Sequence, residues 1–480
     1  MRAAGLTRAL AAAPWAALDA AATGLYGVLF VLVVGWLVGP AELGLASSAL
    51  AFVLLAEALS AAGLQDAVIR LPSADTRQTD AAHSLAMLLS FAAVPIVCGA
   101  AWLYGLATGE PRLLPLTALA AVMLPFNAAA CVPTALLVRK MRGRQLLIRP
   151  LAGKLAGMAV LLVVAVSGGR ASAVVAASVA TSLGGTAALW IATTRRPRLR
   201  WHGPAAAAQL RFGLFAGTDS LFWLIGVRLF TLAFGAGFGM SALGYLQLAL
   251  RLVEELSRLL QSIIMRYALA LFAEIRRTGA DAGRALLLAM RVMNAPAVAV
   301  FAGLACVGDL AVVAIVGQRW AEAGGYTKLL GVAAVLTFAR LLVAPALKAI
   351  GRPDRVALAA VLNLATALAV IATLPFVAPR VAVTLWAARE LFALAIWSRL
   401  AHRHLGLSYR DLARALAPSW AAGAVMAAVL LGLRPATERL ALLMPAGAIV
   451  YAVMLWGCER TPLAAWWRGA KGGRWRRSMS

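Results

Sequence analysis

The sequence predicts an all-α integral membrane protein with about fourteen transmembrane helices. Hydrophobic residues occupy 62% of the 480 positions, and the mean hydropathy is +0.85. Soluble domains are nearer half apolar, so this composition indicates a lipid environment. Apolar runs of helical length recur along the whole chain, rich in Gly, Ala and Leu and without the alternation typical of strands. The sequence therefore favours a helical bundle in a bilayer.

Short polar stretches separate the apolar runs, each of which is about the 20 residues that a bilayer core requires. The runs centre roughly on residues 26, 55, 94, 125, 160, 181, 223, 256, 297, 338, 367, 391, 424 and 447. The first run has the basic and small residues of a signal peptide, but it continues for a full span to Val38. We therefore expect it to be the first transmembrane helix and to remain uncleaved.

The formal net charge of +26 follows the predicted topology. With a cytoplasmic N-terminus, thirty of the 45 Lys and Arg residues fall in cytoplasmic segments and seven in the opposite loops. This asymmetry is the positive-inside rule, and it predicts that both termini are cytoplasmic. We interpret the basic character as topological, and no nucleic-acid partner is predicted.

The cysteines, histidines and glycine-rich segments mainly exclude other classes of protein. The four cysteines lie singly in apolar runs, and the four histidines lack metal-binding spacing outside one Arg-rich cytoplasmic loop. No glycine-rich loop ends in Gly-Lys-Ser/Thr, so no ATPase activity is predicted. We expect neither a metal nor another cofactor, and the energy for any activity must come from elsewhere.

An internal repeat becomes visible when the sequence is shifted by 200 residues. Residues 15–60 then align with 215–260 without a gap, and thirteen of the 46 positions are identical, including Asp19 with Asp219 and Gly39 with Gly239. The stretches ALLVRKMRGRQLLI and ALKAIGRPDRVALA form a second related pair. Because six spans separate the copies, the repeat is parallel, with an axis along the membrane normal.

The repeat predicts three parts in the chain. We expect a six-helix lobe at 1–205, a second six-helix lobe at 206–405, and two additional transmembrane helices with a basic cytoplasmic tail at 406–480.

Four charges interrupt the eighth apolar run, SALGYLQLALRLVEELSRLLQS. Arg251 and Glu255 are spaced i, i+4, as are Glu254 and Arg258, so both pairs can meet on a helix. One interpretation is internal neutralisation, which lets a long helix extend into the cytoplasm. The other is that Arg251 and Arg258, about two turns apart, line a cationic cavity, since Arg binds phosphate through a planar donor fork.

Arg228 is the sharper candidate, because it lies in the middle of a span with no acid three or four residues away. A charge in the bilayer normally faces a water-filled cavity or a partner charge. The partner would have to come from another helix, and the possibilities are Asp19, Glu57 and Glu390. Arg340 and Arg389 are weaker candidates near span ends, where snorkelling would bring their charges to the interface.

Two stretches resemble the polysaccharide-repeat-unit flippases of the multidrug/oligosaccharidyl-lipid/polysaccharide (MOP) exporter superfamily. They are LVGPAELGLASSALAFVLLAEALSAAGLQDAVIRL and FGMSALGYLQLALRLVEEL. The matching residues of the first stretch are Val38, Gly39, Pro40, Gly44, Gly63 and Leu64, and those of the second are Leu243, Gly244, Tyr245, Ala249, Arg251 and Leu252. The resemblance covers roughly residues 15–400. The family often has Asp three residues after the Arg of the seventh span, where this chain has Thr231, and the only acid of that span is Asp219.

The resemblance implies a two-lobed transporter, not an enzyme, in the bacterial inner membrane. Such a protein flips an undecaprenyl-pyrophosphate-linked oligosaccharide to the periplasmic leaflet by alternating access, for O-antigen, lipopolysaccharide or exopolysaccharide synthesis. The implied partners are this lipid-linked substrate, membrane lipid, and possible polymerase and glycosyltransferases. The candidate cavity residues are Arg228, Arg251, Arg258, Glu254, Glu255, Asp19, Asp219, Arg340 and Arg389.

Three alternatives stay open. A multidrug or cation-coupled exporter and a peptidoglycan-precursor flippase belong to the same superfamily, so fold does not separate them. A multidrug exporter would favour acids for cationic drugs, whereas bases outnumber acids in these spans. A polysaccharide polymerase or ligase would need a large polar periplasmic loop, and the longest candidate, 307–328, is short and largely apolar.

The topology is testable by labelling single cysteines in a background without the four native ones. We expect cysteines placed at Arg144 and Arg476 to resist a membrane-impermeant maleimide in intact cells and to react after permeabilisation. Labelling at either position in intact cells would reverse the orientation.

Overall fold

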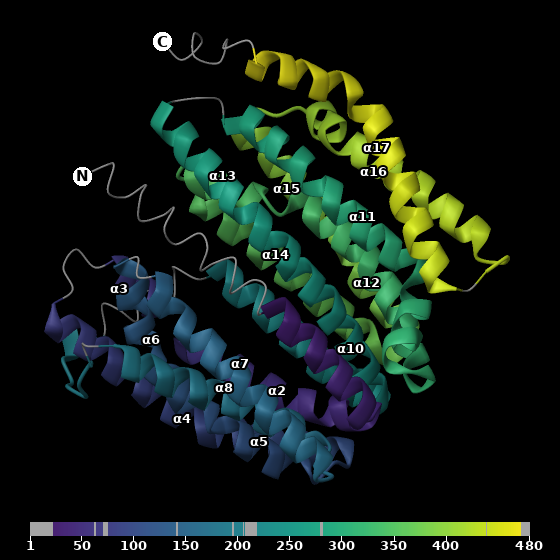
Figure 1. The fold of residues 1–480 in the computed structure, drawn as a ribbon. Helices are drawn as coiled ribbons and strands as arrows, with labels where there is room; N and C mark the ends of the chain where they lie inside the picture. The colour runs from purple at the N-terminus through teal and green to yellow at the C-terminus, as the bar shows by residue number, and fades with distance from the viewer. Residues whose placement is uncertain are drawn as a thin grey trace. The chain divides into compact units, whose positions relative to one another are not determined.

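A computed structural model describes residues 23–61, 64–70, 75–140, 143–193, 196–204, 206, 218–278, 282–437 and 439–471 of the chain. Within these ranges every regular element is a helix, as the composition predicts (Figure 1). After a first helix at Thr23–Leu37 come α2 (Pro40–Ala61), α3 (Leu64–Arg70), α4 (Thr76–Thr108), α5 (Leu113–Ala121), α6 (Met123–Arg139), α7 (Gly143–Val166) and α8 (Ala171–Ala192). The later helices are α10 (Thr218–Thr278), α11 (Ala282–Val316), α12 (Ala321–Arg340), α13 (Val343–Ala349), α14 (Pro353–Thr373), α15 (Pro379–Leu405), α16 (Tyr409–Leu433) and α17 (Leu440–Lys471).

The helices confirm the predicted class of membrane protein. Among the described residues, 12 helical stretches are long and apolar enough to cross a membrane. One of them, Leu221–Gln261, contains two of the predicted spans, because Gly239 interrupts the helix with a φ of 84°. The shorter apolar helix Thr23–Leu37 corresponds to the first predicted span. With these two adjustments the helices account for the fourteen predicted runs.

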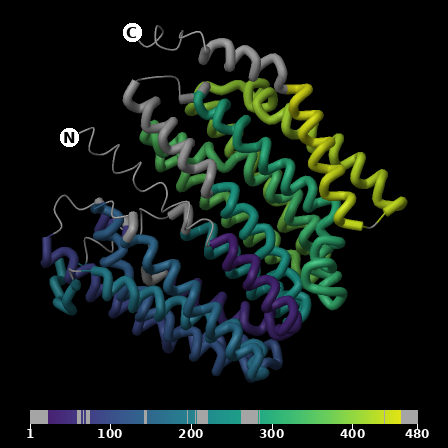
Figure 2. Tube along the Cα trace, viewed as in Figure 1, coloured from purple at the N-terminus to yellow at the C-terminus, as the bar shows by residue number. Residues whose placement is uncertain are grey.

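The chain divides into two compact units. The first comprises Met1–Ser262, Ile315–Ala323 and Val356–Trp386, and the second comprises Ile263–Ala314, Gly324–Arg355 and Ala387–Ser480. The lobe boundaries proposed from the repeat, 1–205, 206–405 and 406–480, stay a prediction. Figure 2 follows the trace through the first unit, where α7 and α8 run side by side.

The repeated segments have the same organisation within the first unit. Gly39 lies in the short break between the first helix and α2, and Gly239 lies at the kink of α10. The break therefore falls at the same register in both copies. At Gly239 the positive φ favours glycine, because a side chain would strain this backbone conformation.

A reciprocal contact joins the two copies. A Cβ atom on Gly44 would overlap the backbone carbonyl of Met240, and one on Gly244 would overlap the carbonyl of Pro40. Positions 40 and 44 correspond to 240 and 244 in the repeat, so the contact has the self-complementary form of a two-fold interface. The aligned glycines are thus packing positions that allow two backbones to touch.

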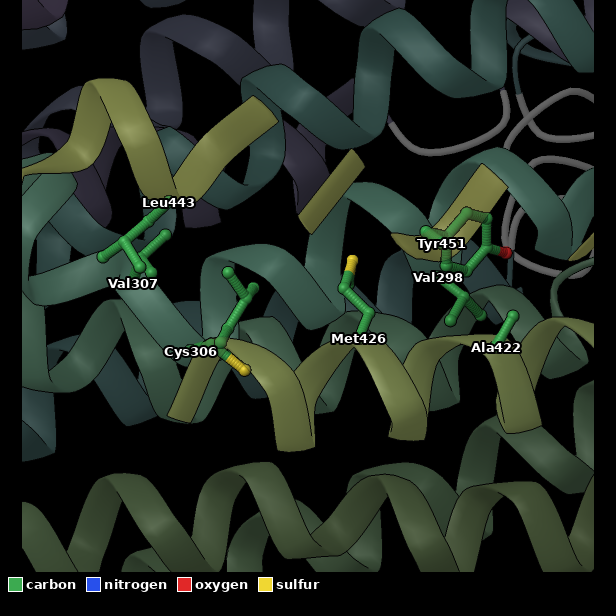
Figure 3. Close-up of a cluster of buried hydrophobic side chains, with 8 residues drawn as sticks. Val298, Cys306, Val307, Ala422, Met426, Leu443 and Tyr451 are labelled. Atoms are coloured by element: carbon green, nitrogen blue, oxygen red, sulfur yellow. The ribbon is translucent and has the colours of Figure 1, made fainter. Parts of the chain in front are cut away.

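The last two helices pack on α11 in the second unit (Figure 3). Val298 and Cys306 of α11 contact Met426 of α16 and Tyr451 of α17 in one buried cluster. The Tyr451 hydroxyl also donates a 2.6 Å hydrogen bond to the carbonyl of Ala295. The C-terminal helices are therefore anchored to the bundle by both apolar packing and a hydrogen bond.

The reciprocal glycine contact predicts the effect of adding one methyl group. Because a backbone carbonyl has little freedom to move, Gly44→Ala and Gly244→Ala should each cost about 1–3 kcal/mol. We expect a lower thermal unfolding midpoint for both variants in detergent. Gly237→Ala is the matched control, since nothing lies within 4 Å of its Cβ position. Equal midpoints for all three variants would contradict the close contact.

Candidate functional site

A cavity of about 130 Å³ lies within the first unit. Four elements form its wall: the first helix, α2, α8 and α10. Its lining residues are Phe30, Val31, Val34, Leu43, Ser47, Leu50, Leu54, Val174, Ser178, Val227, Arg228, Thr231, Gln247, Leu248, Leu250, Arg251 and Glu254. The candidates Arg228, Arg251 and Glu254 are thus brought together in one cavity.

The two copies of the repeat line this cavity with opposite character. Thr231, Gln247 and Glu254 line it from the second copy. Their equivalents in the first copy, which also line it, are Val31, Ser47 and Leu54. One wall is therefore mostly apolar and the other carries the charges, an arrangement that suits a ligand with an apolar part and an anionic part.

Arg228 has no hydrogen bond or ion pair with any residue that the structure describes. Its Nε atom is buried, and the charged groups that act on it electrostatically are Glu254 and Arg251. Glu57 and Glu390, two of the three partners considered from the sequence, instead interact with other arginines. As far as the described residues show, the donors of this arginine in a membrane span are available for a ligand.

Glu255 neutralises the other arginines of α10. Its Oε1 atom lies 3.1 Å from Arg251 Nε and 2.7 Å from Arg258 Nη2, and its side chain is 8% exposed. The first helix accommodates this carboxylate at Gly27, where a Cβ atom would overlap it. The predicted Arg251–Glu255 pair is therefore confirmed, and it forms where the first helix packs on α10.

The predicted pairing of Glu254 with Arg258 is wrong. Arg258 bonds Glu255 at i, i+3, and Glu254 makes no ion pair with the residues that the structure describes. The reason is the direction of the side chains: Glu255 is buried between neighbours, whereas Glu254 is exposed and faces the cavity. Arg258 is not among the cavity-lining residues, although Arg251 is.

Aromatic and polar neighbours hold Arg251 and the adjoining wall in place. The Arg251 guanidinium lies 4.2 Å from the centroid of the Phe30 ring, a cation–π contact. Gln247 donates to the Thr231 hydroxyl at 3.2 Å, and this hydroxyl donates to the Val227 carbonyl at 2.9 Å. The sequence interpretation did not identify Gln247, although the repeat aligns it with Ser47 and both are polar positions in apolar helices.

Arg340 and Arg389 lie in the second unit, where both contact Glu390. Arg340 Nη2 is 2.5 Å and Arg389 Nη2 is 3.2 Å from carboxylate oxygens of Glu390, and Thr337 donates a further hydrogen bond. The two arginine side chains are only 14% and 10% exposed, so the snorkelling expectation is wrong. Glu390 stabilises them inside the protein. Their assignment to a substrate cavity stays a prediction.

A polar network in the first unit also escaped the sequence interpretation. Arg149 donates to Thr134 at 3.2 Å and to Asn127 at 3.4 Å, while Ser182 donates to Asn127 at 2.7 Å. Glu57 interacts with both Asn127 and Arg149. Arg149 lies in α7. Only the folded structure joins these residues, which come from α2, α6, α7 and α8.

Asp19 and the side chain of Asp219 lie outside the described residues. Their roles as candidate cavity residues stay predictions.

Known structures with similar folds are transporters. Lipid II flippase MurJ in an inward closed conformation matches with a TM-score of 0.75 and 11% identity, over 93% of this chain and 99% of that one. An inward-facing multidrug resistance MATE family transporter of the MOP superfamily matches at 0.58 and 15%, over 80% and 95%. The eukaryotic MATE transporter AtDTX14 matches at 0.51 and 13%, over 86% and 100%. No curated protein sequence matches the chain significantly.

These likenesses define a class, the multi-pass membrane proteins with the fold shared by MurJ and the MATE transporters. Residues 33–324 match the model of the family described as polysaccharide biosynthesis protein. The chain belongs to this family. The family match agrees with the resemblance to polysaccharide-related proteins found in the sequence, and the fold is the one that this resemblance implied.

The ion cluster of Glu390 with Arg340 and Arg389 predicts that loss of a buried carboxylate destabilises the protein more than loss of an exposed one. Glu390→Gln leaves two buried arginines without a counter-charge, and we expect a loss of about 3 kcal/mol. Glu322→Gln is the matched control, because Glu322 pairs with Arg380 where their side chains are 50% and 69% exposed. Thermal unfolding in detergent should show a large decrease in midpoint for Glu390→Gln alone. Similar midpoints for the two variants would contradict this description of the cluster.

Proposed function

We propose that this protein flips an undecaprenyl-pyrophosphate-linked oligosaccharide from the cytoplasmic to the periplasmic leaflet of the bacterial inner membrane. The observation that carries the proposal is Arg228, which lines the cavity and has no bonded partner among the described residues. Arg251 lies in the same cavity; Glu255 pairs with its Nε atom, and its Nη groups have no partner among the described residues and can donate to a pyrophosphate. Membership of the polysaccharide biosynthesis family supports a sugar-bearing lipid.

The low dielectric of the bilayer makes this charge arrangement selective. Attraction between a guanidinium and a phosphate is much stronger in a site with little water than at a protein surface. Two arginines face one free carboxylate in the cavity, which favours an anionic ligand over the cationic drugs of a multidrug exporter. The apolar wall from the first copy of the repeat offers a surface for the adjoining isoprenyl chain.

Release of the ligand requires the cavity to open to the periplasmic side of the membrane. In alternating access, the two repeat-related halves rock around a site near the membrane midplane. Water entering from the periplasmic side would then replace the arginine–phosphate contacts and lower the affinity. This function is transport without covalent chemistry, so we assign no enzymatic activity. A peptidoglycan precursor is the closest alternative substrate, since it shares the same lipid pyrophosphate.

The same proposal implies partner enzymes on both sides of the membrane. Cytoplasmic glycosyltransferases would supply the lipid-linked unit, and a periplasmic polysaccharide polymerase would use it. Both termini would lie in the cytoplasm. A deletion strain tests the function directly: lipid-linked repeat units should accumulate in the cytoplasmic leaflet. Normal surface polysaccharide, or accumulation of peptidoglycan precursor alone, would overturn the assignment.

Arg228 provides the mutational test. Arg228→Ala should reduce polysaccharide export roughly tenfold, corresponding to a lost interaction of about 1.4 kcal/mol, with unchanged protein in the membrane. Arg228→Lys should restore export only in part, because an ammonium group lacks the planar fork. Surface polysaccharide measured per unit of protein is the readout. Wild-type export by Arg228→Ala would refute a required role.

A further inference from the structure

We propose that Glu254 is the exchangeable counter-charge of the cavity, a carboxylate that competes with the ligand's phosphate for Arg228 and Arg251. This inference rests on the proposed function and adds a residue that sets affinity and release.

Two consecutive glutamates of α10 have different environments. Glu255 is 8% exposed and holds two arginines, Arg251 and Arg258. Glu254 is exposed, lines the cavity and makes no hydrogen bond or ion pair with any described residue. Glu255 is therefore committed to the packing of the helix, whereas the carboxylate of Glu254 is available.

The charged lining of the cavity consists of three groups. Arg228, Arg251 and Glu254 all come from α10, and the residues contributed by the first helix, α2 and α8 are uncharged. Glu254 acts electrostatically on Arg228, while Arg251 repels it. When no ligand is bound, Glu254 thus lowers the positive potential that Arg228, which has no bonded partner among the described residues, creates in a membrane span.

A phosphate group entering the cavity meets both the arginines and this carboxylate. Like charges at close range oppose one another, so a bound phosphate must push the Glu254 side chain away or bear its repulsion. Because Glu254 is exposed and not hydrogen-bonded, such a movement breaks no described contact. The same carboxylate can approach the arginines as the phosphate leaves, which favours release after the site opens. Glu254 thereby keeps affinity below the level at which the ligand would remain bound.

The position of Glu254 is occupied by an uncharged residue in the first copy of the repeat. Leu54 occupies the register of Glu254 and lines the same cavity from α2. Packing at this register is therefore compatible with an uncharged side chain. We infer that the charge of Glu254 serves the ligand site and is not needed to hold the helices together.

The experiment compares five full-length proteins in detergent: wild type, Glu254→Gln, Gln247→Glu, Glu42→Gln and Arg228→Ala. Gln247→Glu adds a carboxylate to the same cavity with little change in shape. Glu42→Gln is the control outside the cavity, where Glu42 pairs with Arg112. The probes are farnesyl pyrophosphate and farnesol, which differ in the anionic group. Affinity is measured by ligand-induced changes in intrinsic fluorescence, and thermal unfolding checks that each variant is folded.

We expect Glu254→Gln to bind farnesyl pyrophosphate roughly tenfold more tightly than wild type, which corresponds to about 1.4 kcal/mol. Gln247→Glu should bind it more weakly, Glu42→Gln should match wild type, and farnesol affinity should not change in any variant. In cells, Glu254→Gln should export less polysaccharide despite its tighter binding, because release becomes slower.

The outcomes separate the two proposals. The counter-charge role alone would be overturned if Glu254→Gln bound farnesyl pyrophosphate no more tightly than wild type does. In that case wild type would still prefer farnesyl pyrophosphate to farnesol, and Arg228→Ala would have lost this preference. A wild-type protein that binds farnesyl pyrophosphate no better than farnesol would overturn the proposed function itself.

Discussion

The energetic cost of a charge inside a bilayer constrains this structure more than any other factor. A charged side chain in a transmembrane segment must face water or find partners, since hydrocarbon offers none. The described spans meet this requirement by sharing single carboxylates among several cations: Glu255 holds Arg251 and Arg258, and Glu390 holds Arg340 and Arg389. Against this background Arg228 and Glu254 are distinctive, because neither has a bonded partner among the described residues and both line the same cavity.

The repeat explains how such a cavity arises within a duplicated framework. Glycines at 44 and 244 bring the two copies into backbone contact at matching positions, so both copies present the same registers to the space between them. The chemistry of the two sides nevertheless differs. Leu54 and Val31 make one wall apolar, while Glu254 and Thr231 make the opposite wall polar. A symmetric fold can thus hold an amphipathic ligand in one orientation.

Both units hold buried arginines through polar networks that join several helices. In the first unit, Ser182 of α8 donates to Asn127 of α6, and Asn127 also accepts from Arg149 and interacts with Glu57. In the second unit, Thr337 of α12 donates to Glu390 of α15, which also holds Arg340 and Arg389. In each network one polar side chain serves several partners from different helices.

The sequence by itself determined the fold class, the number of spans and the positions of the turns, because hydrophobic length and glycine placement are local properties of the chain. It also determined the Arg251–Glu255 pair, which one helix brings together through its own periodicity. Only the tertiary structure decided that Arg258 turns to Glu255, since the first helix presents Gly27 there and buries that carboxylate. The same holds for Arg149, whose partners come from α6. Contacts between distant segments depend on which helix faces meet, and a single sequence does not encode that as a local pattern.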